Sequence, residues 1–283
     1  MISVVTGGAS GIGAAIAKRL VARGDTVVVA DVNLPAAQSI AEQLAAQGPG
    51  RAEPAAVDVT ERDDVHALVE DVVGKHGRID LFFNNAGIGT GGLAEELTSA
   101  HWDRTLDVNL RGVVHGVEAV YPLMLRQESG HIVNTASLAG LVPAPLMAAY
   151  TTSKWAVVGL SRALREEGAA SGVKVSALCP AFAATPLLDE INSGLPATLA
   201  SKQTKRHVQR IQGRLATADE VAAAALAGVA KNKALILVPG KAKLAAYGFR
   251  FAPQLVTAVI RYEVARYRRD SAALSPTPTI PTP

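Results

Sequence analysis

Short runs of apolar, often β-branched residues alternate with longer segments rich in alanine and leucine along most of this chain. The short runs are apolar at nearly every position, which is typical of strands that helices cover on both faces of a parallel sheet. Repetition of this kind predicts one doubly wound α/β domain. The seven predicted strands are Ile2–Thr6, Thr26–Ala30, Ala55–Val57, Leu81–Phe83, His131–Thr135, Lys174–Leu178 and Leu235–Val238. The six predicted helices are Ile12–Arg23, Pro35–Gln47, Arg62–His76, Ala100–Arg126, Tyr150–Ala170 and Ala218–Ala230.

The alternation accounts for residues 1–240, so we predict a single domain there and assign the remaining segments separately. Residues 185–213 are an insertion after the sixth strand. Residues 241–269 form a basic, aromatic segment that we expect to be helical, and residues 270–283 form a tail rich in Pro and Thr that we expect to be flexible.

Charge and cysteine content narrow the classes of partner. The net charge is +3 over 283 residues, and residues 241–283 hold seven Lys or Arg against two acids, so the remainder carries −2. We therefore expect no nucleic-acid partner.

The single cysteine, Cys179, permits no intramolecular disulfide and predicts a reducing, cytoplasmic location. We also expect no metal site, secretory signal or membrane-spanning helix.

A glycine-rich turn joins the first predicted strand to the first helix. Gly7–Gly13 contains four glycines, which permit tight turning and close approach of the backbone to a pyrophosphate at the positive end of the helix. Asp31 ends the second strand, where a carboxylate would accept hydrogen bonds from the adenosine ribose and repel a 2′-phosphate. Val32 and Asn33 supply no cation for such a phosphate. The pattern predicts a Rossmann fold that binds NAD(H) in preference to NADP(H).

Tyr150 and Lys154 stand four residues apart in a predicted helix, so their side chains share one face. A free phenol titrates near pH ~10, and a nearby cation favours the phenolate and lowers the pKa. Such a tyrosine can give a proton to a carbonyl oxygen or take one from a hydroxyl. The pair therefore indicates acid/base chemistry.

Six motifs follow one another in the chain: the turn from Thr6 to Gly13, Asp58-Val59, Asn84-Asn85-Ala86-Gly87, Asn109, Ser137 and Tyr150-x-x-x-Lys154. With these motifs the chain resembles the short-chain dehydrogenases/reductases from Ile2 to about Val238. The resemblance implies a homodimer or homotetramer that packs through the long helices and interconverts an alcohol and a carbonyl compound with a nicotinamide cofactor.

The resemblance also implies roles for individual residues. Tyr150 would be the acid/base, with its pKa lowered by Lys154, which would also bind the nicotinamide ribose. Ser137 would hydrogen-bond the substrate oxygen, and Asn109 would hold a water in a proton relay. The expected cofactor-binding set is Gly7, Ser10, Gly11, Ile12, Gly13, Asp31, Asp58, Val59, Asn85, Ala86, Gly87, Tyr150, Lys154, Pro180 and Thr185. Ala181 replaces a usual glycine of the family, and the region beyond Pro239 is unlike the usual family ending.

The insertion and the basic segment should determine the substrate. We expect residues 185–213 to fold over it as a lid. In residues 241–269, five aromatics accompany seven cations, and apolar residues recur at helical spacing from Val256 to Tyr267. That apolar face could pack on the body or another subunit, or rest on an anionic membrane. Peripheral membrane contact would suit a lipophilic alcohol or ketone.

Two other functions fit the same residues. The chain could be a non-catalytic NAD-binding regulatory or scaffold protein on the same fold, although such a protein would not need Ser137, Tyr150 and Lys154. It could also be a related NAD enzyme such as an epimerase, but the short glycine loop and Asn109 fit a simple dehydrogenase better.

Overall fold

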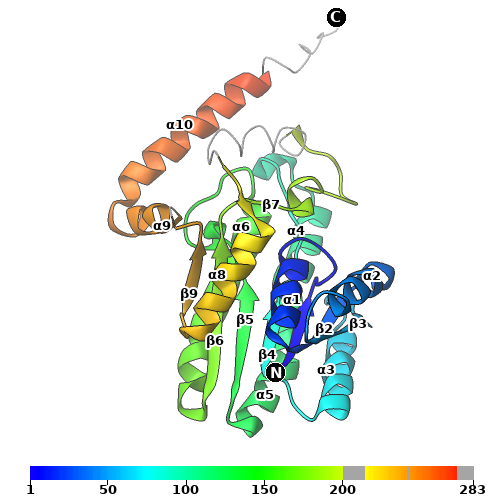
Figure 1. Ribbon diagram of the computed structural model, residues 1–283. Helices are drawn as coiled ribbons and strands as arrows, with labels where there is room; N and C mark the ends of the chain where they lie inside the picture. The colour runs from blue at the N-terminus through cyan, green and yellow to red at the C-terminus, as the bar shows by residue number, and fades with distance from the viewer. Residues whose placement is uncertain (200–213, 241, 273–283) are drawn as a thin grey trace, which may run out of the picture.

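The computed structural model of the chain describes residues 1–199, 214–240 and 242–272. Seven parallel strands form one sheet in the order β3-β2-β1-β4-β5-β6-β9, flanked by helices on both faces (Figure 1). This is the predicted doubly wound Rossmann fold. The strands are β1 (Ile2–Thr6), β2 (Thr26–Asp31), β3 (Arg51–Ala56), β4 (Leu81–Asn84), β5 (Gly130–Thr135), β6 (Val173–Pro180) and β9 (Leu235–Val238).

The helices that cover the sheet form two layers. The core on one face joins α1 (Gly11–Arg23), α2 (Leu34–Ala45) and α8 (Ala218–Ala230) to alternate strand residues such as Val5, Phe83 and Val133. The core on the other face joins α3 (Arg62–His76), α5 (Gly112–Gln127) and α6 (Ala148–Gly168) to Val4, Phe82 and Ile132. Neighbouring residues of one strand are thus buried on opposite faces, which explains the continuous apolar runs in the sequence.

Two elements differ clearly from their predictions, and one predicted helix start is confirmed. β3 starts four residues before the predicted Ala55, because pairing with β2 extends it through Arg51–Pro54, where the sequence has little apolar signal. The predicted helix Ala100–Arg126 is three pieces: α4 (Ser99–Leu106), a π-helical turn (Asp107–Arg111) and α5. Helix α8 begins where predicted: Thr217 Oγ1 accepts a hydrogen bond from Glu220 N–H, and the Glu220 carboxylate accepts one from Thr217 N–H.

The segments beyond the main sheet lie at its carboxyl edge. A small parallel pair, β7 (Ala183–Ala184) and β8 (Ala216–Thr217), brackets the insertion, of which residues 200–213 lie outside the described part. Beyond β9 come α9 (Ala242–Phe251) and α10 (Pro253–Ala272), so the segment predicted to be helical is two helices. Figure 1 shows both projecting at one side of this edge. The tail from residue 273 is outside the described residues.

Candidate active site

The carboxyl ends of the parallel strands surround a pocket of about 1260 Å³. A typical pocket for one ligand measures roughly 300–1,000 Å³, so this one has room for a dinucleotide and a substrate together. In an open parallel sheet, ligands bind at this edge where the strand order reverses, here between β1 and β4. Every predicted site residue lines the pocket except Gly13 and Asn109.

The glycine turn between β1 and α1 forms one end of the pocket. Gly7 and Gly11 have φ values of +60° and +50°, which favour glycine. A Cβ on Gly13 would lie 2.0 Å from Gly7 O, so Gly13 contributes close packing of the loop and does not line the pocket. The first N–H groups of α1 have no partner within the helix, and this positive end suits a pyrophosphate.

Asp31 lies at the carboxyl end of β2 and lines the same end of the pocket. One carboxylate oxygen accepts a hydrogen bond from Ala9 N–H at 3.1 Å and the other from Asn33 N–H at 3.0 Å. Asp31 therefore also fixes the glycine turn against β2. A carboxylate oxygen has a second lone pair, so both oxygens can still accept a hydrogen bond from a ribose hydroxyl.

Asn85 fastens the same turn to β4. Its side-chain amide donates to Thr6 O at 3.1 Å and to Gly7 O at 3.2 Å, and its backbone N–H donates to Thr6 Oγ1 at 3.0 Å. Further along the pocket, Asp58 accepts hydrogen bonds from the hydroxyl and the N–H of Thr60. Burial raises the pKa of Asp58, but these bonds outweigh it and the net pKa is lowered, which favours an ionised carboxylate at neutral pH.

The first turns of α6 carry Tyr150 and Lys154 into the centre of the pocket. Lys154 Nζ donates to Thr135 O at 2.9 Å and lies 5.5 Å from the centre of the Tyr150 ring. The Ser137 hydroxyl is close enough to the Tyr150 phenol to act on its pKa. Ser137 Oγ also donates to Pro180 O at 3.3 Å and accepts from Ala139 N–H at 3.1 Å. The ends of β5 and β6, together with α6, thus hold two hydroxyls and an ammonium in one cluster.

Burial acts on both titratable groups of this cluster. It raises the pKa of Tyr150, and the neighbouring Ser137 hydroxyl opposes this only in part. It also lowers the pKa of Lys154 to about 8. The sequence-based expectation of a lowered tyrosine pKa is therefore wrong for this structure, because desolvation disfavours the phenolate. At neutral pH the phenol is protonated and can donate a proton.

Asn109 lies behind the cluster on the π-helical turn. Its Oδ1 accepts from Ile88 N–H at 2.8 Å and its Nδ2 donates to Ile88 O at 3.0 Å. Both ends of the amide are thus used to hold the loop after β4. The predicted relay water would have to bind a group of Asn109 that these two bonds leave over, either the second lone pair of Oδ1 or the second N–H of Nδ2.

Sequence reasoning missed several parts of the pocket wall. Leu146 lines it with φ +66°, unusual for a residue other than glycine, and its carbonyl accepts from Gly92 N–H at 2.7 Å. Arg104 of α4 lines it near Asp58. Neither belongs to a recognisable motif, because both reach the pocket only through long-range packing.

The insertion and α10 close the substrate end. Described insertion residues Leu187, Leu188 and Ile191 line the pocket. Asn192 anchors this segment by two hydrogen bonds with the backbone of Gly91, at 2.9 and 2.8 Å. From α10, the residues that line the pocket are Val256, Val259, Ile260, Glu263, Val264 and Tyr267. Most of the apolar face predicted in residues 241–269 (the extension) thus lines the pocket of the domain formed by residues 1–240 (the body).

A parallel sheet with a glycine turn at its switch point and a tyrosine–lysine pair beside it defines a dinucleotide-binding oxidoreductase. Residues 1–196 match the sequence profile of the family described as short chain dehydrogenase. The chain belongs to the short-chain dehydrogenase/reductase family and is an enzyme.

Known relatives cover most of the chain. The 3-oxoacyl-(acyl-carrier-protein) reductase FabG of Thermotoga maritima is 35% identical over 71% of this chain and 81% of its own. The cyclohexanol dehydrogenase of an Acinetobacter species is 36% identical over 78% and 84%. Among solved structures, a short-chain dehydrogenase/reductase from Burkholderia phymatum in complex with NAD has a TM-score of 0.78 at 33% identity, covering 100% of this chain and 97% of its own.

Within the described residues, two further features are absent. No helix there is sufficiently long and apolar to cross a membrane. No group of three or more His, Cys, Asp or Glu side chains there is arranged to hold a metal ion.

Proposed function

We propose that this enzyme interconverts a secondary alcohol and a ketone, or an aldehyde, with NAD(H), and that its substrate is lipophilic. The observation that carries the proposal is the Ser137–Tyr150–Lys154 cluster beside the glycine turn in one pocket. A non-catalytic NAD-binding protein would need the glycine turn but not this cluster.

The residues present divide the work of carbonyl reduction. The bound nicotinamide supplies the hydride. The hydroxyls of Ser137 and Tyr150 orient the carbonyl oxygen and stabilise the negative charge that develops on it. Tyr150, neutral because burial raises its pKa, donates its proton to that oxygen. Lys154 contributes a positive charge next to the phenolate that is left, and it binds the nicotinamide ribose. For alcohol oxidation the steps run in reverse, and the phenolate form of Tyr150 takes the proton from the substrate hydroxyl.

The preference for NAD(H) is supported by Asp31. Its carboxylate lines the adenosine end of the pocket and is held by Ala9 and Asn33 N–H groups. A 2′-phosphate there would meet a fixed negative charge, whereas a ribose hydroxyl would donate a hydrogen bond to it. We expect Asp31→Ala to raise the ratio of kcat/KM for NADPH over NADH, and an unchanged ratio would contradict this account.

A lipophilic substrate is supported by the substrate end of the pocket. Apolar side chains face it from the loop before α6, from the insertion and from α10, including Leu146, Leu187, Ile191, Ile260 and Val264. A site lined in this way favours apolar ligands oriented by a few polar groups. We propose that the insertion acts as the lid over this end.

The decisive experiment measures nicotinamide absorbance with a panel of cyclic and long-chain secondary alcohols and ketones, using NAD(H) and NADP(H). Tyr150→Phe is the matched variant, because it removes one hydroxyl and keeps the ring. We expect turnover to fall about 10²–10⁴-fold while NADH binding, followed by fluorescence titration, is retained. Turnover equal to wild type would refute the assigned role of Tyr150.

Assembly and location complete the proposal. We propose a homodimer or homotetramer that packs through α4, α5 and α6, which sedimentation at several protein concentrations would test. We also propose a cytoplasmic enzyme with peripheral membrane contact through residues 241–269.

A further inference from the structure

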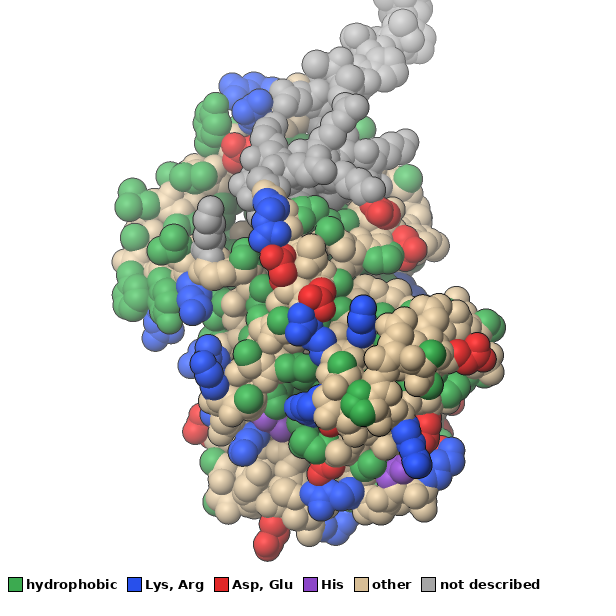
Figure 2. Space-filling model, in the orientation of Figure 1, with side chains coloured by type: hydrophobic (Ala, Val, Ile, Leu, Met, Phe, Trp, Pro, Cys, Tyr) green, Lys and Arg blue, Asp and Glu red, His purple; other side chains and the backbone are tan. Residues whose placement is uncertain are grey.

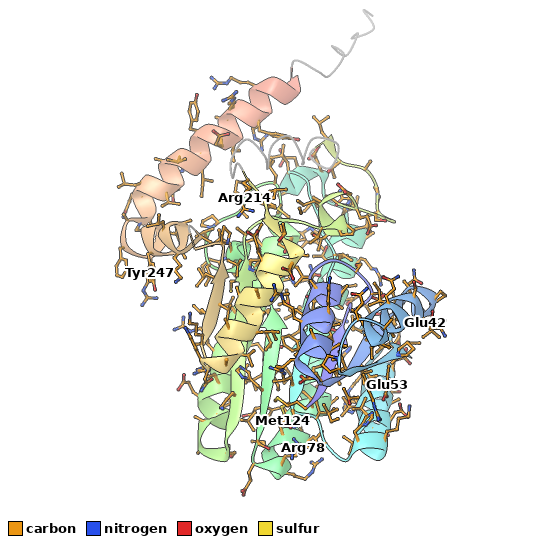
Figure 3. All side chains as sticks on the ribbon, viewed as in Figure 1. Glu42, Glu53, Arg78, Met124, Arg214 and Tyr247 are labelled. Atoms are coloured by element: carbon orange, nitrogen blue, oxygen red, sulfur yellow. The ribbon has the colours of Figure 1, made fainter. Side chains whose placement is uncertain are left out.

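The extension also has apolar side chains that are exposed to solvent. Six of the nine large apolar side chains exposed in the described part of the chain belong to α9 and α10, and each is at least 57% exposed. They are Leu244, Tyr247, Phe251, Leu255, Val259 and Tyr262, here called the outer stripe. Tyr247 lies on the outer side of α9 (Figure 3), and apolar side chains gather over α9 in Figure 2.

The outer stripe has members on both helices. Within each helix they follow one another at intervals of three or four residues, the spacing of neighbours on one helical face. The Tyr247 and Phe251 rings stack, with centroids 6.3 Å apart. Val256 and Ile260 lie about a third of a turn around α10 and line the pocket. The body covers only the face of α10 that lines the pocket. The outer stripe is a second apolar face, and an apolar face left exposed to water marks a site that another surface covers.

Basic residues surround the outer stripe. Residues 242–269 contain six Lys or Arg and one acid, Glu263, which faces the pocket. Lys243, Arg250 and Arg261 are exposed and lie next to stripe residues in the sequence. Arg268 is bound to Glu95 at 2.7 Å, which ties the far end of α10 to the body.

Charge distinguishes two candidates for what covers this face. A second copy docked by twofold symmetry would bring the basic residues of both copies to one interface, where they would repel each other. An anionic lipid surface instead attracts Lys and Arg, accepts apolar side chains below the headgroups and suits tyrosine at the interface. We propose that the outer stripe docks on an anionic membrane surface.

Docking would place the pocket mouth at the bilayer. Val259 belongs to the outer stripe and also lines the pocket, so the pocket opens next to the docked face. An apolar substrate could pass from lipid to the active site along apolar side chains. This delivery step rests on the proposed function, whereas docking itself does not depend on catalysis.

The test is co-sedimentation of the full chain with vesicles of phosphatidylcholine alone or mixed equally with phosphatidylserine. We expect binding to the mixed vesicles, weakened by salt. The triple variant L244S/F251S/L255S should bind at least tenfold more weakly. Lys243→Gln with Arg250→Gln should lower binding about 25-fold, at about fivefold per cation. The control is Lys231→Gln with Lys233→Gln, which makes the same charge change on exposed residues after α8. This control should bind the mixed vesicles as wild type does.

Three results would overturn the proposal. The wild-type protein could stay in the supernatant with both kinds of vesicle, or the stripe and charge variants could bind as well as wild type. Alternatively, light scattering could show a dimer that the triple variant loses, with no vesicle binding by the wild type. Unchanged thermal unfolding of each variant would show that it is folded. NADH titration reports separately on the proposed function, because a protein that binds vesicles but not NADH would refute only the enzyme assignment.

Discussion

Acidification should destabilise this fold through His131 on β5. The side chain is 4% exposed and its Nε2 lies 2.8 Å from Ser176 Oγ. Ser176 Oγ itself donates to Lys233 O at 2.6 Å, so it accepts from His131 and the ring carries its proton on Nε2. Burial, with smaller contributions from the positive charges of Lys174 and Arg165, lowers the pKa of His131 to about 4.

The direction follows from proton uptake. The unfolded chain binds a proton at this histidine below pH about 6.5, whereas the folded chain does so only below about 4. Between these values the unfolded state holds more protons, so the free energy of unfolding falls as the pH falls. The full effect is about 3 kcal/mol, and about 2 kcal/mol is lost between pH about 7.5 and about 5.

Urea unfolding followed by tryptophan fluorescence at these two pH values measures the effect. His131→Gln can still donate to Ser176 but does not titrate, so the loss of stability on acidification should shrink by about 2 kcal/mol. His76→Gln is the control, because His76 lies near the surface, 3.1 Å from Glu53. In this variant His131 is unchanged, so its contribution to the loss of stability on acidification should remain as in wild type. An identical acid dependence in His131→Gln and wild type would refute the reasoning.

Four further predictions concern the pocket. Gly13→Ala places a Cβ 2.0 Å from Gly7 O, so the turn must shift and fluorescence titration should show at least a tenfold loss of NADH affinity. Asn109→Ala leaves the Ile88 N–H and carbonyl without their partner, which should lower the free energy of unfolding by about 2–4 kcal/mol in urea titrations. Because the pKa of Lys154 is about 8, kcat/KM for ketone reduction should fall as the pH rises through that value, and a profile flat to pH about 10 would contradict this. Ile260→Ala enlarges the substrate end, so KM should fall for bulkier ketones relative to small ones, as steady-state kinetics would show.

The sheet and the cofactor end of the pocket could be predicted because their signals are local. Strand runs such as Val4–Val5 and Phe82–Phe83 are buried on alternate faces, and burial on both faces leaves an unmistakable apolar pattern. The glycine turn needs left-handed backbone at Gly7 and Gly11, which the residue type itself reveals.

The interruption of the helix before α5 had no such signal. Asp107–Arg111 forms a π-helical turn that presents Asn109 to the backbone of Ile88, and helical periodicity alone does not mark such a turn. The pKa of Tyr150 was also beyond the sequence: spacing placed Lys154 nearby, but the direction of the shift depended on how strongly both groups are desolvated.

By itself, the sequence determined that this chain folds into a parallel α/β sheet with a dinucleotide turn and a tyrosine–lysine pair on one helical face, because each depends on residues close together along the chain. Only the tertiary structure decided what α10 contacts. Val256, Ile260 and Val264 read as one apolar face in the sequence, but the path of the chain after β9 places them over the pocket and leaves Leu255 and Tyr262 exposed. The physical reason is that helical spacing defines a face, whereas long-range packing selects which surface covers it.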